Sequence, residues 1–504
     1  MEKTRIPYAC TLLVLSAACD SEVLTTSTAQ ALTQTVCSGG LCYEVADPIH
    51  DDEKCPGDRY IGYTSSSSCP VAGSSWTTSH LFEGSSGELA RFCLYTWPSG
   101  SAPVPGELPV IPRAKDCPVV TPLSPSLNSP LSREAVLEDA FLDQVEAFGS
   151  LQAAVDPIPV AVIDAGPAAA PPLWTEGRIA HPRALQLLIH RLACPQNGAL
   201  GQLCAADPYS FLALPRYREP SGAIGYDVVD GGEFGYQSDL AIAIFEAARD
   251  LRQPQGPQAI LNLSVGWHPG AAGPGTPGSF SPPVDAVYRA LQYASCHEHL
   301  IFAAAGNTTG GAHVAPSAFL PGAWTTLPSP APTDCRTLFG LRPTAPPLGI
   351  PHPLVHATAG LDSQDDMLHN AVPGARPRLL AAGSYSVVED RVSPAAGDYT
   401  PPLTGSSIST AVLSAAAAVV WSLRPHLTAP EVAEAVYASG HPTFMATELH
   451  LGRAGLAHRV SMCGSAEDAC LLRGSCSVAC VRQGGKRDLR PRLPPLTASD
   501  VASA

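Results

Sequence analysis

Short apolar runs alternate with helical patterns between about residue 157 and residue 445. The clearest runs read IPVAVID, AILNLSVG, LIFAAAG and RLLAAGS, and each is followed by a turn residue. Short aliphatic runs separated by helices are typical of a parallel sheet that is covered by helices. The sequence therefore predicts an α/β fold over this region, and functional side chains are expected at the carboxyl ends of its strands.

Composition limits the kinds of protein to which this chain can belong. Its 504 residues are 45% hydrophobic, which suits a globular protein with one large domain and smaller modules. Its 51 prolines and 43 glycines predict long loops. The formal net charge is -15 and no Lys/Arg-rich run occurs, so a nucleic-acid partner is not expected.

Residues 1–19 have the layout of an export signal. Lys3 and Arg5 precede an apolar core of about eight residues, and small residues follow it. This core is too short to span a bilayer, which takes about 20 residues. The stretch LSAAC also resembles a bacterial lipoprotein signal, in which Cys19 would carry the lipid, although Ser16 stands where an aliphatic residue is usual. We expect an exported protein, either secreted or held at the cell envelope through Cys19.

The cysteine content supports export. Of the 16 cysteines, Cys10 and Cys19 lie in the export signal, and the even number that remains is typical of disulfides in an oxidising compartment. Their spacing does not determine which cysteines pair. A zinc site is not expected, because no CxxC pair occurs in the compact last group. The three groups are Cys37, Cys42, Cys55, Cys69, Cys93 and Cys117; Cys194, Cys204, Cys296 and Cys335; and Cys463, Cys470, Cys476 and Cys480.

Changes in composition predict the division of the chain into segments. Residues 37–117 are a cysteine-rich module, which is either retained in the mature protein or a propeptide that is removed with the rest of residues 20–150. A Pro/Ser-rich linker and a helix occupy residues 118–150, and the apolar spacing places this helix between Ser132 and Gly149. The remaining segments are the α/β domain over 157–445, a cysteine-containing C-terminal extension over 446–483 and a disordered tail over 484–504.

Two polar residues near the first apolar run are candidates for catalysis. Asp164 follows four apolar residues, so its carboxylate is expected to be half buried and to need a partner such as a histidine N–H. His181 stands at the start of a predicted helix, HPRALQLLIH, where the helix dipole keeps an imidazole neutral enough to accept a proton. The alternatives are that Asp164 caps a turn and that His181 is a capping or surface residue.

Two further candidates follow later runs. Asn307 ends the run LIFAAAGN, where its amide could donate a hydrogen bond to an oxyanion, although Gly-Asn is also an ordinary turn. Ser407 lies in LTGSSISTAVLSAAAAVVW at the start of a predicted helix, where serine is most often only an N-cap. The apolar part of this stretch, residues 411–421, is shorter than a membrane span. We therefore expect a buried helix with Ser407 at its positive end.

The order of these motifs resembles that of the subtilisin-like serine peptidases, whose catalytic residues occur in the order Asp, His, Ser. The stretch VAVIDAG resembles the aspartate motif of the family, HPRALQLLI its histidine helix and ILNLSVG its substrate-binding strand. AAAGN resembles its oxyanion motif and GSSIS its nucleophile motif. The resemblance covers residues 157–445 and implies a parallel sheet flanked by helices.

The resemblance also implies a role for each matching residue. Asp164 would orient the imidazole of His181, which would act as general base and then as general acid. Ser407 would be the nucleophile, and Asn307 would form the oxyanion hole with the backbone N–H of Ser407. The backbone of Leu263, Ser264, Val265 and Gly266 would bind a polypeptide substrate as an added strand. No cofactor is implied. Structural calcium is common in the family, but no acidic run has the spacing of a calcium loop.

Four residues depart from the motifs of the family. Ala165 follows the aspartate in place of Ser or Thr, and Pro182 follows the histidine in place of glycine. Ser406 precedes Ser407 in place of Thr, and Ala411 replaces a proline. The sequence thus leaves two hypotheses: an exported serine endopeptidase that forms an acyl-enzyme, and a catalytically weak or inactive peptide-binding protein of the cell envelope. Substrate specificity and oligomeric state cannot be predicted from the sequence.

Overall fold

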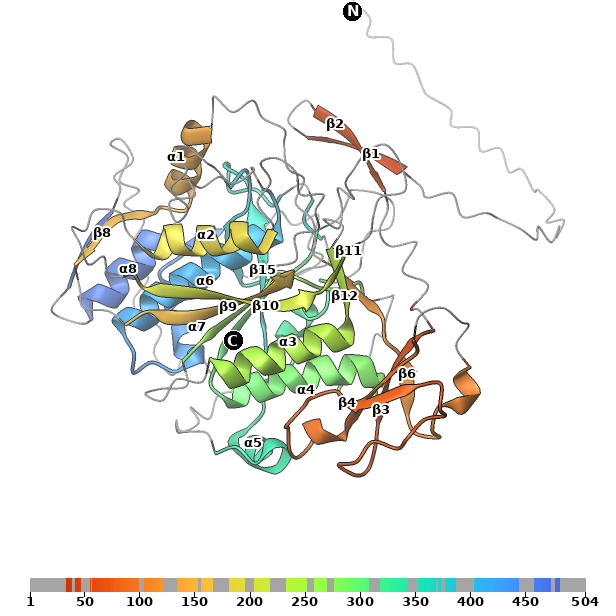
Figure 1. Ribbon diagram of the computed structural model, residues 1–504. Helices are drawn as coiled ribbons and strands as arrows, with labels where there is room; N and C mark the ends of the chain where they lie inside the picture. Colours follow the sequence, from red (N-terminus) through yellow and green to blue (C-terminus); the bar gives the residue numbers. More distant parts are fainter. Residues whose placement is uncertain are drawn as a thin grey trace, which may run out of the picture.

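The computed structural model describes most of the α/β region and parts of the segments around it (Figure 1). The predicted export signal with Cys19 and the predicted tail over 484–504 lie outside the described residues. The described residues are 33–38, 41–46, 55, 57–98, 104–120, 134–152, 156–165, 181–194, 204–217, 233–251, 258–269, 276–307, 318–342, 352–368, 370–372, 377–386, 403–443, 457–472 and 476–480.

A sheet of eight strands forms the centre of the fold, in the order β10-β9-β13-β14-β15-β16-β18-β17. Neighbouring strands run parallel except for β17, which pairs antiparallel with β18. The four apolar runs form β9, β13, β14 and β16, so the predicted α/β fold with a parallel sheet is confirmed. The strands are β9 (Ile158–Ala165), β10 (Ala206–Leu214), β13 (Ile260–Leu263), β14 (Leu300–Ala304), β15 (His356–Leu361), β16 (Leu379–Ala382), β17 (His441–Thr443) and β18 (Ala457–Arg459).

Helices cover both faces of the sheet (Figure 1). Side chains alternate between the two faces along a strand, and in β9 Val160 and Val162 join one core while Ala161 and Ile163 join the other. Strands buried on both faces read as continuous apolar runs, which is why the sequence reveals them. The first core contains α2 (His181–Ala193), α6 (Ser406–Leu423), α7 (Ala429–Ala438) and α8 (Met462–Leu471); the second contains α3 (Gln237–Asp250), α4 (Pro282–Cys296) and α5 (Pro332–Phe339).

Helix α6 is buried along its whole length. In the described part of the chain it is the one helix that is long and apolar enough to cross a membrane, with 18 residues and a mean hydropathy of 1.6. Every residue of this helix is buried inside the fold, so α6 is the core helix that the sequence predicted. The sequence argument rested on the apolar run 411–421, which is too short to span a membrane. The whole helix is long enough to span one, so its burial inside the fold is the stronger evidence that it is a core helix.

The N-terminal cysteine-rich module contains a four-stranded antiparallel sheet in the order β4-β5-β3-β6. Phe82 of this module packs against Phe245 of α3, with ring centroids 5.4 Å apart. Ile61 and Phe92 lie in the same core as α3 and α4, so the module and the α/β domain share one apolar core. The strands are β3 (Arg59–Tyr63), β4 (Thr77–His80), β5 (Phe92–Thr96) and β6 (Arg113–Lys115), and a separate hairpin joins β1 (Thr33–Ser38) to β2 (Leu41–Ala46).

Asp116 connects this module to the start of α3. Its carboxylate is fully buried and lies 3.1 Å from Nε of Arg59, while the backbone N–H of Ser238 donates to Oδ1 at 3.0 Å. The hydroxyl of Ser238 also donates to Asp116, and Arg59 reaches Asp239 at 3.0 Å. A carboxylate beside the first N–H groups of a helix is stabilised by the helix dipole.

Six disulfides connect cysteines of the described residues. The cysteines of the C-terminal group pair with one another, and both pairs of the N-terminal module lie within it. Several disulfides in one chain suggest an extracytoplasmic location. The pairs are Cys55–Cys117, Cys69–Cys93, Cys194–Cys204, Cys296–Cys335, Cys463–Cys480 and Cys470–Cys476.

The linker helix α1 (Glu134–Gln144) ends earlier than the predicted stop at Gly149. Glu146 adopts a left-handed backbone with φ of 52°, and the next residues form β8 (Phe148–Gln152), which pairs with β19 (Ser477–Cys480). Strand pairing and contacts with the C-terminal segment therefore override the helical pattern. Another short strand nearby, β7 (Pro118–Val120), pairs with β12 (Glu233–Tyr236), which also pairs with β11 (Arg216–Tyr217).

Glu146 forms ion pairs that hold the linker against the sheet. Its carboxylate lies 2.8 Å from Arg459 and 2.9 Å from His441. Burial raises the pKa of Glu146, but hydrogen bonds from His441 and Ser461 and the charges of His441 and Arg459 outweigh this and lower it to about 2. The ionised form of Glu146 is therefore the one that stabilises the fold.

We expect Asp116→Ala to lower the free energy of unfolding by about 1–3 kcal/mol, because it removes the acceptor of the buried N–H and hydroxyl of Ser238 and one of the two carboxylate partners of Arg59. Chemical denaturation with the disulfides intact measures this loss. The control is Asp250→Ala, which removes a carboxylate that is 51% exposed and paired with Arg249. That change should cost about 1 kcal/mol or less. Equal losses in the two variants would contradict the role assigned to Asp116.

The lowered pKa of Glu146 predicts a pH dependence of stability. The contribution of Glu146 should be complete above its ordinary pKa of 4.5 and should disappear as the pH falls towards 2. Since the side chain is 30% exposed, we expect about 2–3 kcal/mol for the full effect. Denaturation of the wild type and of Glu146→Gln should therefore differ at pH 6 and converge near pH 2. A difference that stays constant over this range would refute the assignment.

Candidate active site

Asp164 and His181 are in direct contact at the carboxyl ends of the parallel strands. Asp164 is the penultimate residue of β9 and is fully buried, and its Oδ2 lies 2.9 Å from Nδ1 of His181. Oδ1 accepts a hydrogen bond from the backbone N–H of Ala165 at 2.7 Å. Because Nδ1 faces a carboxylate, this nitrogen carries the proton, and the acceptor of a neutral imidazole is then Nε2.

Pro182 is compatible with this contact. Helix α2 begins at His181, so Pro182 stands in its first turn, where a missing N–H breaks no intrahelical hydrogen bond. The proline is buried, and the imidazole of His181 still reaches Asp164. Replacing the glycine that is usual in the family therefore leaves the Asp–His pair intact.

Ser407 is the second residue of α6 and has no exposed surface. The first N–H groups of a helix have no intrahelical partner, and the dipole makes this end positive. Ser264, just beyond the end of β13, donates its hydroxyl to the backbone oxygen of Ser407 at 3.4 Å. The structure thus places the predicted nucleophile beside the predicted substrate-binding segment.

Asn307 follows β14 and contacts the residue before Ser407. Its Oδ1 accepts hydrogen bonds from the backbone N–H of Ser406 at 3.0 Å and from the hydroxyl of Ser406 at 3.1 Å. Since Oδ1 faces these donors, the Nδ2 group is at the other end of the amide, where it can donate. Ser406, which replaces the threonine of the family motif, retains a hydroxyl for this purpose.

The predicted substrate-binding residues Leu263, Ser264, Val265 and Gly266 are all buried, and only Leu263 belongs to β13 itself. The chain then passes close to other backbone, because a Cβ atom at Gly266 would lie 2.7 Å from the backbone oxygen of Leu320. Position 266 therefore requires glycine. The candidates come from three neighbouring strands, β9, β13 and β14, and from the starts of α2 and α6.

A chain of buried polar side chains, which the sequence analysis missed, supports this arrangement. Asn262 of β13 donates Nδ2 to the hydroxyl of Ser414 at 3.0 Å and accepts the hydroxyl of Ser264 at 3.0 Å. Ser414 donates to the backbone oxygen of Thr410, and the hydroxyls of Thr410 and Thr358 are 2.5 Å apart. The sequence contains a signal for this network: Asn262 is a polar residue inside an apolar run, and Thr410 and Ser414 are hydroxyl residues four positions apart in α6.

Two clusters in the described part of the chain could hold a metal by distance alone. They are His190 with Cys194 and Cys204, and Glu467 with Cys463 and Cys480. In each cluster both cysteines form a disulfide with each other. A metal binds the thiolate form of cysteine, so neither cluster is a metal site while its disulfide is intact.

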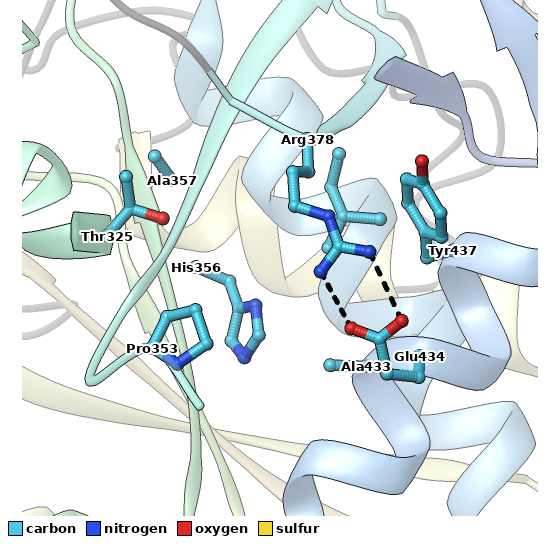
Figure 2. Close-up of a pocket in the computed structure, with 9 residues that line it drawn as sticks. Thr325, Pro353, His356, Ala357, Arg378, Ala433, Glu434 and Tyr437 are labelled. Atoms are coloured by element: carbon cyan, nitrogen blue, oxygen red, sulfur yellow. Dashed lines mark hydrogen bonds and ion pairs between the residues drawn. The ribbon is translucent and has the colours of Figure 1, made fainter. Parts of the chain in front are cut away.

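A pocket lies near the amino ends of two of the parallel strands, opposite the candidate active site (Figure 2). It is lined by His356 and Leu379, which are the first residues of β15 and β16, whereas the candidate active site lies at and beyond the last residues of β9, β13 and β14. Arg378 and Glu434 form a bidentate ion pair there, in which Nη1 and Nη2 donate to Oε1 and Oε2 at 2.7 and 3.2 Å. Burial, together with the charges of His352 and Arg378, lowers the pKa of His356 to about 3. The imidazole of His356 is therefore neutral at physiological pH.

The fold and the site define an α/β protein in which an Asp–His pair, an asparagine and a buried serine lie at the carboxyl ends of parallel strands. Residues 220–451 match the family model of the Subtilase family, Peptidase_S8, over slightly less than half of the chain. By this match, the part of the chain from 220 to 451 is similar to the subtilases, a family of serine peptidases. A peptidase family implies a polypeptide substrate. The matched region contains Ser264, Asn307 and Ser407 and begins after Asp164 and His181.

Solved structures provide more distant matches. The patellamide maturation protease PatA is 18% identical, with a TM-score of 0.37, and the match covers 62% of this chain and 98% of that one. The prenylagaramide maturation protease PagA is also 18% identical, with a TM-score of 0.37 and coverages of 62% and 94%. A chain of the subtilase cytotoxin SubAB assembly is 16% identical, with a TM-score of 0.39 and coverages of 68% and 98%. No curated protein matches the chain.

The polar chain around Asn262 predicts an energetic coupling between β13 and α6. Asn262→Leu should destabilise the fold by about 1–3 kcal/mol, because the buried hydroxyls of Ser264 and Ser414 each lose one of their two hydrogen-bond partners. In a double-mutant cycle, Asn262→Leu and Ser414→Ala should be non-additive by at least about 0.5 kcal/mol. The matched cycle uses Ser422→Ala at the other end of α6, which should be additive with Asn262→Leu. Additivity in both cycles would show that the polar chain is not coupled.

Proposed function

We propose that the protein is an exported serine endopeptidase that hydrolyses peptide bonds through an acyl-enzyme. Ser407 attacks the carbonyl carbon of the scissile bond, and Nε2 of His181 takes the proton of the serine hydroxyl. His181 then gives this proton to the leaving amine, and a water molecule, activated in the same way, hydrolyses the acyl-enzyme. Asp164 keeps the imidazole in the required tautomer and stabilises the imidazolium that forms.

The observation that carries this proposal is the 2.9 Å contact between His181 Nδ1 and the fully buried carboxylate of Asp164. A buried carboxylate needs a compensating donor, and this one has both the imidazole and the N–H of Ala165. Capping of a turn accounts for the contact with Ala165 but not for the contact with His181. A purely structural role for Asp164 therefore does not explain why it contacts His181, whereas a catalytic role does.

Stabilisation of the oxyanion is assigned to Asn307 and to the backbone N–H of Ser407. The hydrogen bonds from Ser406 to Oδ1 of Asn307 hold the amide next to the start of α6. Donors that are fixed before the reaction stabilise the charge of the transition state without a reorganisation cost. The backbone of Leu263 to Gly266 is assigned to pairing with an extended substrate.

A second function, peptide binding without efficient cleavage, is favoured by one observation. Ser407 has no exposed surface, so a substrate can reach its hydroxyl only if neighbouring chain moves. This hypothesis predicts that peptides bind equally well before and after Ser407→Ala and are not hydrolysed by either form.

Hydrolysis of an unfolded protein such as reduced casein distinguishes the two functions. The wild type should cleave it, and Ser407→Ala should lower kcat on the order of 10⁶-fold. Asn307→Ala should lower kcat by about 10²–10³-fold, because one oxyanion donor is lost. The control is Ser422→Ala, a buried serine at the other end of α6 whose hydroxyl bonds to Val419, and it should retain full turnover. No cleavage by folded wild-type protein, or equal cleavage by Ser407→Ala, would exclude the peptidase function.

Export through an N-terminal signal over residues 1–19 is part of the same proposal, followed either by secretion or by anchoring at the cell envelope through a lipid on Cys19. The disulfides among the described residues support an oxidising location. The shared core of the cysteine-rich module and the α/β domain supports retention of that module in the mature protein. The intact mass of the mature protein gives its first residue, any lipid on it and the presence or loss of residues 20–150.

A further inference from the structure

Residues 319 and 320 bridge the two backbone segments that flank the proposed reaction centre. Leu320 exchanges two backbone hydrogen bonds with Trp267, both of 3.0 Å, just beyond the substrate-binding segment. On the other side, the N–H of Phe319 donates to the backbone oxygen of Ala305 at 2.9 Å, two residues before Asn307. The side chain of Phe319 is therefore held between the end of β13 and the end of β14.

The ring of Phe319 lies directly on bare glycine backbone. A Cβ atom at Gly306 would lie 2.6 Å from Cγ and Cδ1 of Phe319, and one at Gly266 would lie 3.3 Å from its Cβ. Gly306 also has a left-handed φ of 96°, which favours glycine at this position. His268 packs against the ring edge to face, with centroids 6.0 Å apart. Gly306 thus leaves room for the ring of Phe319, and Gly266 leaves room for its Cβ atom.

Under the proposed function, Phe319 lies next to the substrate residue whose carbonyl group Ser407 attacks. The carbonyl that Ser407 attacks must lie near Asn307, and the residue that carries it must pair with the backbone that ends at Gly266. Side chains of an extended strand project away from the strand axis in alternating directions. The side chain of this residue therefore enters the space between residues 264–266 and 305–307, and the first wall that it meets is Phe319.

We propose that Phe319 is a specificity-determining residue, which limits the substrate residue on the acyl side of the scissile bond to small side chains such as Gly, Ala or Ser. This inference rests on the proposed function. Phe319 is 8% exposed and packs in a small apolar cluster with Leu361 and Val372, so neighbouring side chains restrict the movement of its ring. A large substrate side chain would have to displace a ring that is packed on several sides, and close-packed interiors resist such displacement.

Peptides that differ only in the residue on the acyl side test the proposal. For the wild type, kcat/KM should be at least about 10-fold higher with Ala than with Phe or Leu at this position, which is the scale of discrimination by pocket size. Phe319→Ala should reverse this ratio, and Phe319→Leu, which leaves the site partly filled and is more certain to fold, should move it in the same direction. The control is Phe339→Ala, a buried phenylalanine of α5 that packs on Tyr293 and should leave the ratio unchanged. A wild-type preference for Phe or Leu, or ratios unchanged by both Phe319 variants, would overturn the proposal.

Binding separates a failure of this inference from a failure of the proposed function. Calorimetry on Ser407→Ala measures the Kd of the same peptides without chemistry. If the wild type hydrolyses none of the peptides but Ser407→Ala still binds the Ala peptide at least about 10-fold more tightly than the Phe peptide, the peptidase function fails and the role of Phe319 stands. If the peptides are hydrolysed but their Kd and kcat/KM are independent of this residue in the wild type and in Phe319→Leu, the role of Phe319 is refuted and the peptidase function stands.

Discussion

Complete burial of helix α6 is the constraint on which the rest of the structure depends. A helix without exposed surface needs apolar neighbours all round, and it has them in α2, α7, α8 and the sheet. Its polar side chains need partners as well, because an unpaired buried hydroxyl is costly. Ser409 donates to the backbone oxygen of Ala381 and Ser414 to that of Thr410. The central position of α6 fixes where its first turn, and with it Ser407, meets the edge of the sheet.

The candidate site follows from this packing. Parallel strands bring all their carboxyl ends to one edge, so Asp164, Ser264 and Asn307, which follow or end three adjacent strands, become neighbours although they are far apart in the chain. The start of α6 is then bound to two of these strand ends, through Ser264 to Ser407 and through Asn307 to Ser406. The same edge holds Asp164 against His181. The pocket at the other edge shares none of these residues.

The sequence predicted the strands that are buried on both faces, because burial on both faces produces an uninterrupted apolar run. It missed β10, an edge strand in which Tyr209 and Leu212 are 41% and 49% exposed, and β15, whose residues HATAGL have no aliphatic run. The predicted end of α1 was also wrong, because Glu146 binds Arg459, a contact with a residue more than 300 positions away that the local sequence does not reveal. The place of Phe319 could not be predicted for the same reason: its contact with Gly306 depends on how the chain returns to the sheet after β14.

The central claim is that Ser407, rather than any other serine of this chain, is the nucleophile. Treating the folded wild-type protein with a fluorophosphonate, digesting it and mapping the phosphonylated peptide by mass spectrometry tests this most directly. The account predicts one adduct, on the Oγ atom of Ser407, which disappears when Asp164 is replaced by Asn. An adduct on another serine, or no adduct on protein whose fold is intact by circular dichroism, would contradict it.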